Sequence, residues 1–306
     1  MKKYLLSFGV LAAATLSLTS CLGSGSNDQK YTFNYGPSNC FNRVVDMETE
    51  ETYIGLNPAY SFEFNMSTQL LKIEMSNLKL AAGNGLSMRL PDMPFKLDTN
   101  DGFYTASATT LSPVGQTSSM LIEDFNFRSY PFLSVYNVNF TVDDRYKVTT
   151  YPMLSTYYGS ISATNLTPDA TETFYSVTND KETSYKVLIN PEKMTAILAV
   201  FGGKYSKNMT RYDFAARELP IVLTNDGYVI STDADDVKDL YSPNVVESTT
   251  AKPLPDCTIS NIRVNGVLRT GASISFDCNL GDLGKYSVRA TLRYLLYETN
   301  NPSTQQ

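Results

Sequence analysis

The side chains of this sequence that could carry out acid–base chemistry are mainly carboxylates, because the chain contains no histidine. Catalytic triads and metal sites that depend on imidazole are therefore excluded. A first acidic group lies in residues 42–52, at Asp46, Glu48, Glu50 and Glu51. Two such carboxylates could serve as general acid and base in a hydrolase. No spacing within the group supports that chemistry, so a solvated loop or strand face is the better interpretation.

A second acidic group places three carboxylates close together, at Asp233, Asp235 and Asp236. Oxygen ligands of this kind suit calcium. The spacing matches no EF-hand loop, however, and lacks the glycine and the final glutamate of that loop. We therefore expect these residues to cap a short helix that begins near Asp236. The sequence predicts no metal, no cofactor and no enzyme activity.

Cysteines are the other candidates for chemistry, and the chain has four, at Cys21, Cys40, Cys257 and Cys278. Cys257 and Cys278 flank one predicted hairpin and would face each other only if its loop were centred between residues 267 and 268. A turn at residues 265–266 would instead place them roughly 13 Å out of register, too far for a disulfide. Both arrangements stay open, with small buried thiols favoured. Cys40 has no evident partner.

Cys21 ends a segment that is typical of exported proteins. Lys2 and Lys3 precede an apolar run over residues 4–18, which is shorter than the ~20 residues of a membrane-spanning helix and predicts a secretory signal. The run leads into Leu18-Thr19-Ser20-Cys21. Here the chain resembles the bacterial lipoprotein family, although an ordinary signal peptide followed by an incidental cysteine is the alternative.

The resemblance covers the first 21 residues and implies how the protein is anchored. It implies cleavage after a signal peptide at residues 1–20, a thioether-linked diacylglycerol on Cys21, and acylation of the new N-terminus. Residues 21–30 are rich in Gly and Ser and predict a flexible tether. The lack of Asp at position 22 implies the outer membrane by the sorting rule of the family, with the periplasmic or surface face undecided.

Two similar stretches organise the rest of the chain. Residues 94–103 and 220–228 each contain a proline-led apolar run, then Thr-Asn-Asp-Gly and an aromatic residue. An Asp-Gly pair between apolar runs indicates a two-residue type I′ turn. We therefore expect Asp101-Gly102 and Asp226-Gly227 at the centres of two equivalent hairpins. The expected cross-strand pairs are Leu97 with Ala106 and Leu223 with Ile230.

Further segments match on both sides of the two hairpins, with the same period and phase. Tyr60 and Tyr185, for example, begin alternating strands forty residues before the asparagines of the two turns. This pattern predicts a tandem repeat, at residues 31–155 and 156–298, followed by a polar tail at 299–306. The junction lacks a Gly/Ser linker, so we expect the two domains to pack against each other.

Alternation of apolar and polar residues, with frequent turn signals, predicts an all-β fold. No segment sustains helical periodicity, and only residues 212–218 and 235–241 could form helical turns. We expect two tandem, similar antiparallel domains, each a β-sandwich or a small β-barrel.

The formal net charge of −6 makes nucleic acid an improbable partner. The favoured function is a non-catalytic binding or structural module, tethered to the membrane through Cys21, with a glycan, protein or lipid ligand. The alternative is a carrier of a lipid or other hydrophobic ligand, held in a barrel cavity or an inter-domain groove. A carboxylate-dependent hydrolase ranks third.

Overall fold

The computed structural model describes residues 30–36, 39–81, 85–99, 102–115, 119–130, 135–167, 172–176, 182–268 and 270–294. Within these residues the secondary structure consists of β-strands and one 3₁₀ turn, η2 (Gly281–Leu283), which confirms the all-β prediction. The expected signal peptide, Cys21, the tether up to residue 29 and the tail lie outside them. No helix in this part of the chain is long and apolar enough to span a membrane.

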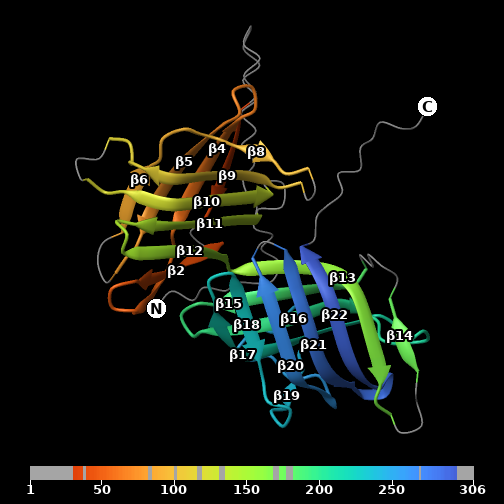
Figure 1. The fold of residues 1–306 in the computed structure, drawn as a ribbon. Helices are drawn as coiled ribbons and strands as arrows, with labels where there is room; N and C mark the ends of the chain where they lie inside the picture. Colours follow the sequence, from red (N-terminus) through yellow and green to blue (C-terminus); the bar gives the residue numbers. More distant parts are fainter. Residues whose placement is uncertain are drawn as a thin grey trace, which may run out of the picture.

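The first half of the chain forms a sandwich of two antiparallel sheets (Figure 1). One sheet contains β1 (Lys30–Tyr35), β4 (Ala59–Asn65), β5 (Leu70–Leu78), β6 (Leu86–Arg89) and β7 (Met93–Pro94). The other contains β2 (Cys40–Asp46), β3 (Thr52–Gly55), β8 (Lys96–Leu97), β9 (Tyr104–Leu111), β10 (Ile122–Tyr130), β11 (Val135–Val142) and β12 (Tyr146–Pro152). Their orders are β1-β4-β5-β6, with β7 also on β5, and β3-β2-β12-β11-β10-β9-β8.

Alternation along the strands builds the core between the two sheets. In β4, Tyr60, Phe62 and Phe64 are buried while their neighbours are half-buried. The Phe62 ring lies 4.8 Å from the ring of Phe127 and 4.9 Å from the ring of Tyr136, both in the opposite sheet. These aromatic contacts between sheets add to the apolar burial that holds the sandwich together.

The second half of the chain forms a closed barrel (Figure 1). Its wall strands are β13 (Leu154–Asn165), β15 (Ser184–Asn190), β16 (Thr195–Gly203), β17 (Tyr212–Leu223), β18 (Gly227–Ser231), β20 (Cys257–Val267), β21 (Gly271–Leu280) and β22 (Lys285–Tyr294). They pair in that order, and β13 closes the barrel by pairing with both β15 and β22. Two short strands extend the wall, β14 (Thr173–Tyr175) on β13 and β19 (Lys238–Asp239) on β20.

Large aromatic side chains fill the inside of the barrel. Tyr157, Tyr185, Tyr205, Tyr228 and Phe276 are all at most 1% exposed. The hydroxyl groups of Tyr157 and Tyr228 lie 2.8 Å apart and form a hydrogen bond, so these two buried polar groups satisfy each other inside the barrel. A barrel of this strand number has an interior that side chains can fill.

The two halves pair their strands in a similar way. In the barrel, β13 pairs first with β15 and then with β22, whereas in the sandwich two separate strands share this role, β1 on β4 and β2 on β12. The two prolines of the repeated stretches lie at similar ladder positions, Pro94 opposite Leu70 and Pro220 opposite Thr195. The repeat boundaries themselves stay a prediction.

The two halves pack against each other, as expected from the short junction. Phe41 and Tyr151, from β2 and β12 of the sandwich, belong to the apolar cluster of the barrel. The Tyr151 hydroxyl donates a hydrogen bond to the carbonyl oxygen of Thr224. Arg43 Nη1 donates to Asn225 Oδ1 at 3.0 Å. The turn between β17 and β18 therefore rests on the sandwich.

The predicted geometry of that turn is wrong. Leu223 pairs with Tyr228, not with Ile230, and the N–H of Thr224 donates to the carbonyl of Gly227. The central residues are therefore Asn225 and Asp226. Neither of them has the positive φ that a type I′ turn requires.

Gly227 instead lies in β18, where it permits a close approach of two strands. A Cβ atom on Gly227 would lie 1.8 Å from the carbonyl oxygen of Gly266 in β20. The register differs from the predicted one by two residues, so the same side chains still face the core.

The first hairpin also differs from the prediction. Leu97 pairs with Tyr104 rather than with Ala106. The loop closes at Asp98, whose N–H donates to the carbonyl of Phe103. Gly102 has a positive φ of 75°, while Asp101 lies outside the described residues. The longer loop allows the Phe103 side chain to be 95% buried, with the Arg128 guanidinium over its ring.

Both expected helical turns are wrong. Residues 212–218 belong to β17, where Phe214 and Ala216 face the barrel core. Residues 235–241 form a turn followed by β19. Pairing with β16 and β20 satisfies these backbone groups, so the ladders outweigh local helix propensity.

Candidate functional site

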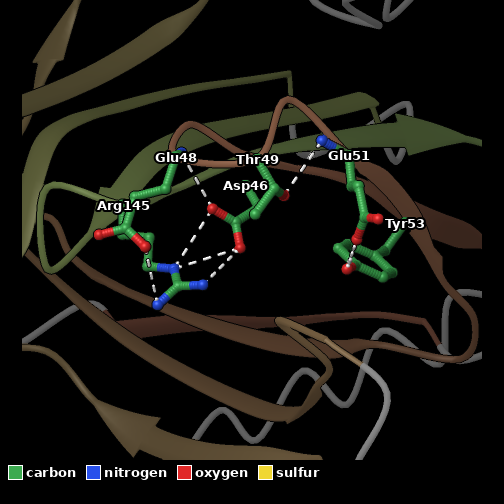
Figure 2. A network of polar contacts seen from close by, with 6 residues as sticks. All are labelled: Asp46, Glu48, Thr49, Glu51, Tyr53 and Arg145. Carbon is green, nitrogen blue, oxygen red and sulfur yellow. Dashed lines mark hydrogen bonds and ion pairs between the residues drawn. The ribbon is translucent and has the colours of Figure 1, made fainter.

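Three members of the first acidic group, Asp46, Glu48 and Glu51, form polar contacts with neighbouring residues, as Figure 2 shows. Asp46 accepts hydrogen bonds from Arg145, with Nη2 at 2.7 Å, and from the backbone N–H of Glu48 at 3.0 Å. Arg145 also forms an ion pair with Glu48. The hydrogen bond from Arg145 is the main cause that lowers the pKa of Asp46. This carboxylate is thus held ionised and fully engaged in closing the turn between β2 and β3.

The second acidic group does not form a metal site. Asp236 pairs with Lys238, with 2.8 Å between the Nζ and Oδ1 atoms, and its N–H donates to the carbonyl of Asp233. Among the described residues, no group of three or more potential metal ligands comes together.

In the structure Cys40, Cys257 and Cys278 are free and buried, which is the arrangement of the buried-thiol interpretation and not of the disulfide alternative. Cys257 pairs with Leu280, and Cys278 pairs with Ile259, which places the two cysteines two residues out of register. The turn alternative at residues 265–266 is also wrong, because these residues lie within β20. Burial raises the pKa of the Cys278 thiol and of the Cys40 thiol. Such protonated, enclosed thiols are poor nucleophiles.

A groove of about 1080 Å³ lies on the outer face of the barrel. Its lining residues come from β18, β20, β21, β22, β13 and β14. The first five are successive strands of the wall (Figure 1). The side chains that point into it alternate with Ile161, Ile230, Val264, Ile274 and Ala290, all buried in the barrel interior. The groove is therefore formed by the outer surface of the wall and not by the core.

Two rows of directly paired residues form the floor of the groove. The arginine row consists of Ser231, Arg263, Ser275, Arg289, Ser162 and Tyr175. The amide row consists of Val229, Asn265, Ser273, Thr291 and Ser160. Most of these side chains end in a hydroxyl, amide or guanidinium group. The floor thus offers a dense array of hydrogen-bond donors and acceptors.

The charge of the groove is positive although the chain as a whole is acidic. Arg263 and Arg289 both line it and are exposed. Neither arginine forms an ion pair with any residue that the structure describes. No Asp or Glu is found among the described residues that line the groove. Two guanidinium groups are therefore available to an anion from solution.

Tyr175 marks one end of the arginine row. Its side chain is 72% exposed, which is unusual for an aromatic residue in this otherwise well-packed protein. At the opposite side, Val229 is paired with Val222, and both are exposed. The groove therefore has apolar surface at its edges and polar groups along its floor.

Sequence reasoning missed this site. The alternation of Ser287, Arg289, Thr291 and Arg293 along the last strand indicated one solvated face. Similar alternation occurs in β13, β20 and β21, at Ser160 and Ser162 and at Arg263 and Asn265, for example. Recognising that these faces adjoin requires the strand order and register, which the sequence did not provide.

Comparisons with known proteins add no functional information. No protein-family model and no curated protein sequence matches the chain. Among solved structures, it is similar to isotype 1 transferrin binding protein B from serogroup B Neisseria meningitidis. That match has 7% identity and a TM-score of 0.25 and covers 87% of this chain and 77% of the other. A double mutant of transferrin binding protein B from Haemophilus parasuis matches with 7% identity and a TM-score of 0.23, over 87% and 76% of the two chains. Similarity this low supports no conclusion about ligands.

Proposed function

We propose that this chain is a non-catalytic binding protein of the bacterial envelope, anchored in the outer membrane through a lipid on Cys21. Its ligand is large and polar and is bound in the groove on the outer face of the barrel. The single observation that supports this proposal is the floor of polar side chains formed by five successive strands, with two arginines that have no ion-pair partner among the described residues. Among the candidate carboxylates, Asp46, Glu48 and Asp236 form ion pairs and Glu51 accepts a hydrogen bond from Tyr53. The three described thiols are buried. This arrangement favours binding over catalysis.

The alternative carrier function has less support. A lipid inside the barrel would have to displace side chains such as Tyr205 and Phe276, which are fully buried and pack edge-to-face at 6.2 Å. The groove on the outside is a poor site for an acyl chain, because most side chains along its floor end in a hydroxyl, amide or guanidinium group, which an acyl chain would leave without a hydrogen-bond partner. Native mass spectrometry of residues 22–306 tests this alternative, and a co-purifying mass of lipid size would favour the carrier.

We also propose that the two halves arose by tandem duplication, with residues 31–155 and 156–298 as the copies. The similar ladder positions of Pro94 and Pro220 support this proposal. In the first copy the sheets are separate, whereas in the second they join into a barrel, and the proposed binding function belongs to the barrel.

A blocking substitution tests whether the groove binds the ligand. Ser275 lies at the centre of the arginine row, so Ser275→Trp would fill the floor with a large ring. Ser61→Trp is the matched control, since Ser61 is a half-buried serine on the outer face of β4 in the sandwich. The mature chain without the lipid, residues 22–306, is applied to an array of immobilised bacterial and host polysaccharides.

We expect binding to at least one polysaccharide and a loss of at least tenfold in Ser275→Trp alone. Equal binding by both variants, or no binding to any member of the array, would contradict the proposal. The anchor is tested separately with the full-length chain: Cys21→Ser should move the protein from the membrane fraction to the soluble fraction.

A further inference from the structure

We infer that the ligand of the groove is an anionic polysaccharide whose sulfate or carboxylate groups bind Arg263 and Arg289. This inference rests on the proposed binding function of the groove and specifies the chemical class of its ligand. It follows from the charge of the floor, the spacing of the two arginines and the hydroxyl groups between them.

The charge favours an anion that carries more than one negative group. Arg263 and Arg289 are exposed and without an ion-pair partner among the described residues. The nearest acidic residue of the adjoining ladder positions, Asp277, is paired with Ser260 and Ser287 and accepts a hydrogen bond from Asn261 at 3.2 Å. A guanidinium offers a planar fork of donors that matches a sulfate or a carboxylate with two hydrogen bonds.

The spacing favours an extended, repeating ligand. Ser275 lies between the two arginines in the arginine row, so they are two strands apart. At the usual separation of neighbouring strands, their Cα atoms lie about 10 Å from each other. One small anion cannot bind both side chains in their outward orientation without bending them together, whereas a chain with regularly placed acidic groups can bind both.

The remaining floor favours a carbohydrate over an acidic protein. Hydroxyl side chains of Ser162, Ser273, Ser275 and Thr291 surround the arginines and can exchange hydrogen bonds with the hydroxyl groups of sugars. The exposed ring of Tyr175 offers an apolar face with a polar tip at the end of the row. The fully buried centre of a protein interface, by contrast, is usually more apolar and rich in aromatic residues, whereas Ser273, Ser275 and the two arginines form the centre of this floor.

The experiment compares five immobilised probes: heparin, which is sulfated, polygalacturonate, which is carboxylated, neutral dextran, poly-glutamate and duplex DNA. Binding of residues 22–306 is measured by biolayer interferometry at low and at high salt. The test variant is Arg263→Ala with Arg289→Ala, and its conservative partner replaces both by Lys. The matched control, Lys147→Ala with Lys193→Ala, removes two exposed positive charges away from the groove.

We expect heparin or polygalacturonate to bind, and the preferred one identifies the acidic group. Charged hydrogen bonds of the usual strength predict a loss of about tenfold to a hundredfold in affinity for each arginine. The lysine variant should retain part of the affinity, because it keeps the charge but not the fork. The control should bind as the unmodified chain does. Affinity should fall at high salt, where exposed charges are screened.

Other results would overturn the inference and are distinguishable from failure of the proposed function. If the chain bound dextran, and if Ser275→Trp abolished this binding while the double alanine variant retained it, the groove would be a site for a neutral glycan. The inference of an anionic ligand would then be wrong. If poly-glutamate or DNA bound as tightly as the acidic polysaccharides or more tightly, and this binding required the arginines, the ligand would be another kind of polyanion. Acidic polysaccharide binding that the alanine variant retains would show that the arginines are not the contacts. Circular dichroism and thermal melting of each variant establish that it is folded.

Discussion

Truncation of Phe41 to alanine should destabilise the barrel, although Phe41 lies in β2 of the sandwich. The side chain is fully buried, belongs to the apolar cluster of the barrel, and stacks on Tyr151 with ring centroids 5.4 Å apart. Removing a buried phenylalanine usually costs about 3–5 kcal/mol, through lost apolar burial and the cavity that is left. That is a large part of the 5–15 kcal/mol typical of a whole domain.

Hydrogen–deuterium exchange with mass spectrometry measures this effect separately in each half. A loss of 3–5 kcal/mol corresponds to roughly a hundredfold to several thousandfold faster exchange of amides that open with the barrel. We expect this acceleration in β15 and β18 of the Phe41→Ala protein. Phe62→Ala is the matched control, because Phe62 is equally buried but contacts Phe127 in the sandwich core.

The control should accelerate exchange mainly in the sandwich strands β4 and β10. If Phe41→Ala left the barrel amides as slow as in the unmodified chain, the two halves would not share a core through β2.

Three further predictions concern ionisable side chains: Tyr151, Asp46 and the three described cysteines. Burial raises the pKa of Tyr151 from 10.0 to about 12. The stabilisation by the neutral hydroxyl is therefore complete below pH 10 and should be lost as pH rises towards 12, by about 2–3 kcal/mol. Denaturant midpoints measured against pH should therefore decline less in Tyr151→Phe than in the unmodified chain. Asp46→Asn should lower the melting temperature at neutral pH, and because the pKa of Asp46 is lowered, the difference from the unmodified chain should shrink only under strongly acidic conditions. Iodoacetamide should leave Cys40, Cys257 and Cys278 unmodified in the folded soluble chain and add to all three in denaturant without reductant, whereas two resistant thiols would indicate a disulfide.

The class of the fold could be predicted because strand patterns are local. The alternation of residues 286–294 is visible in the sequence and is found unchanged in β22. The two repeated stretches also predicted two hairpins in the correct places. Their registers were wrong by two residues, because tertiary packing at Phe103 and the close approach of Gly227 to Gly266 select the loop.

Whether a half forms a sandwich or a barrel depends on whether one continuous strand pairs with both edges of its sheet. In the second half β13 is one strand that pairs on both sides, whereas in the first half the corresponding pairings belong to β1 and β2, which are interrupted after Tyr35. No local sequence pattern predicts such a closure, because it depends on strand pairing between residues more than a hundred positions apart, such as Ile161 and Ala290.

By itself, the sequence determined the all-β class and the lack of imidazole chemistry, because local period and composition specify these two properties directly. Only the tertiary structure decided that Cys40, Cys257 and Cys278 are free, that Asp46 is bound to Arg145, and that Arg263 and Arg289 share one groove. The physical reason is that each of these properties depends on strand order and register. Both are selected by packing and pairing between distant segments of the chain.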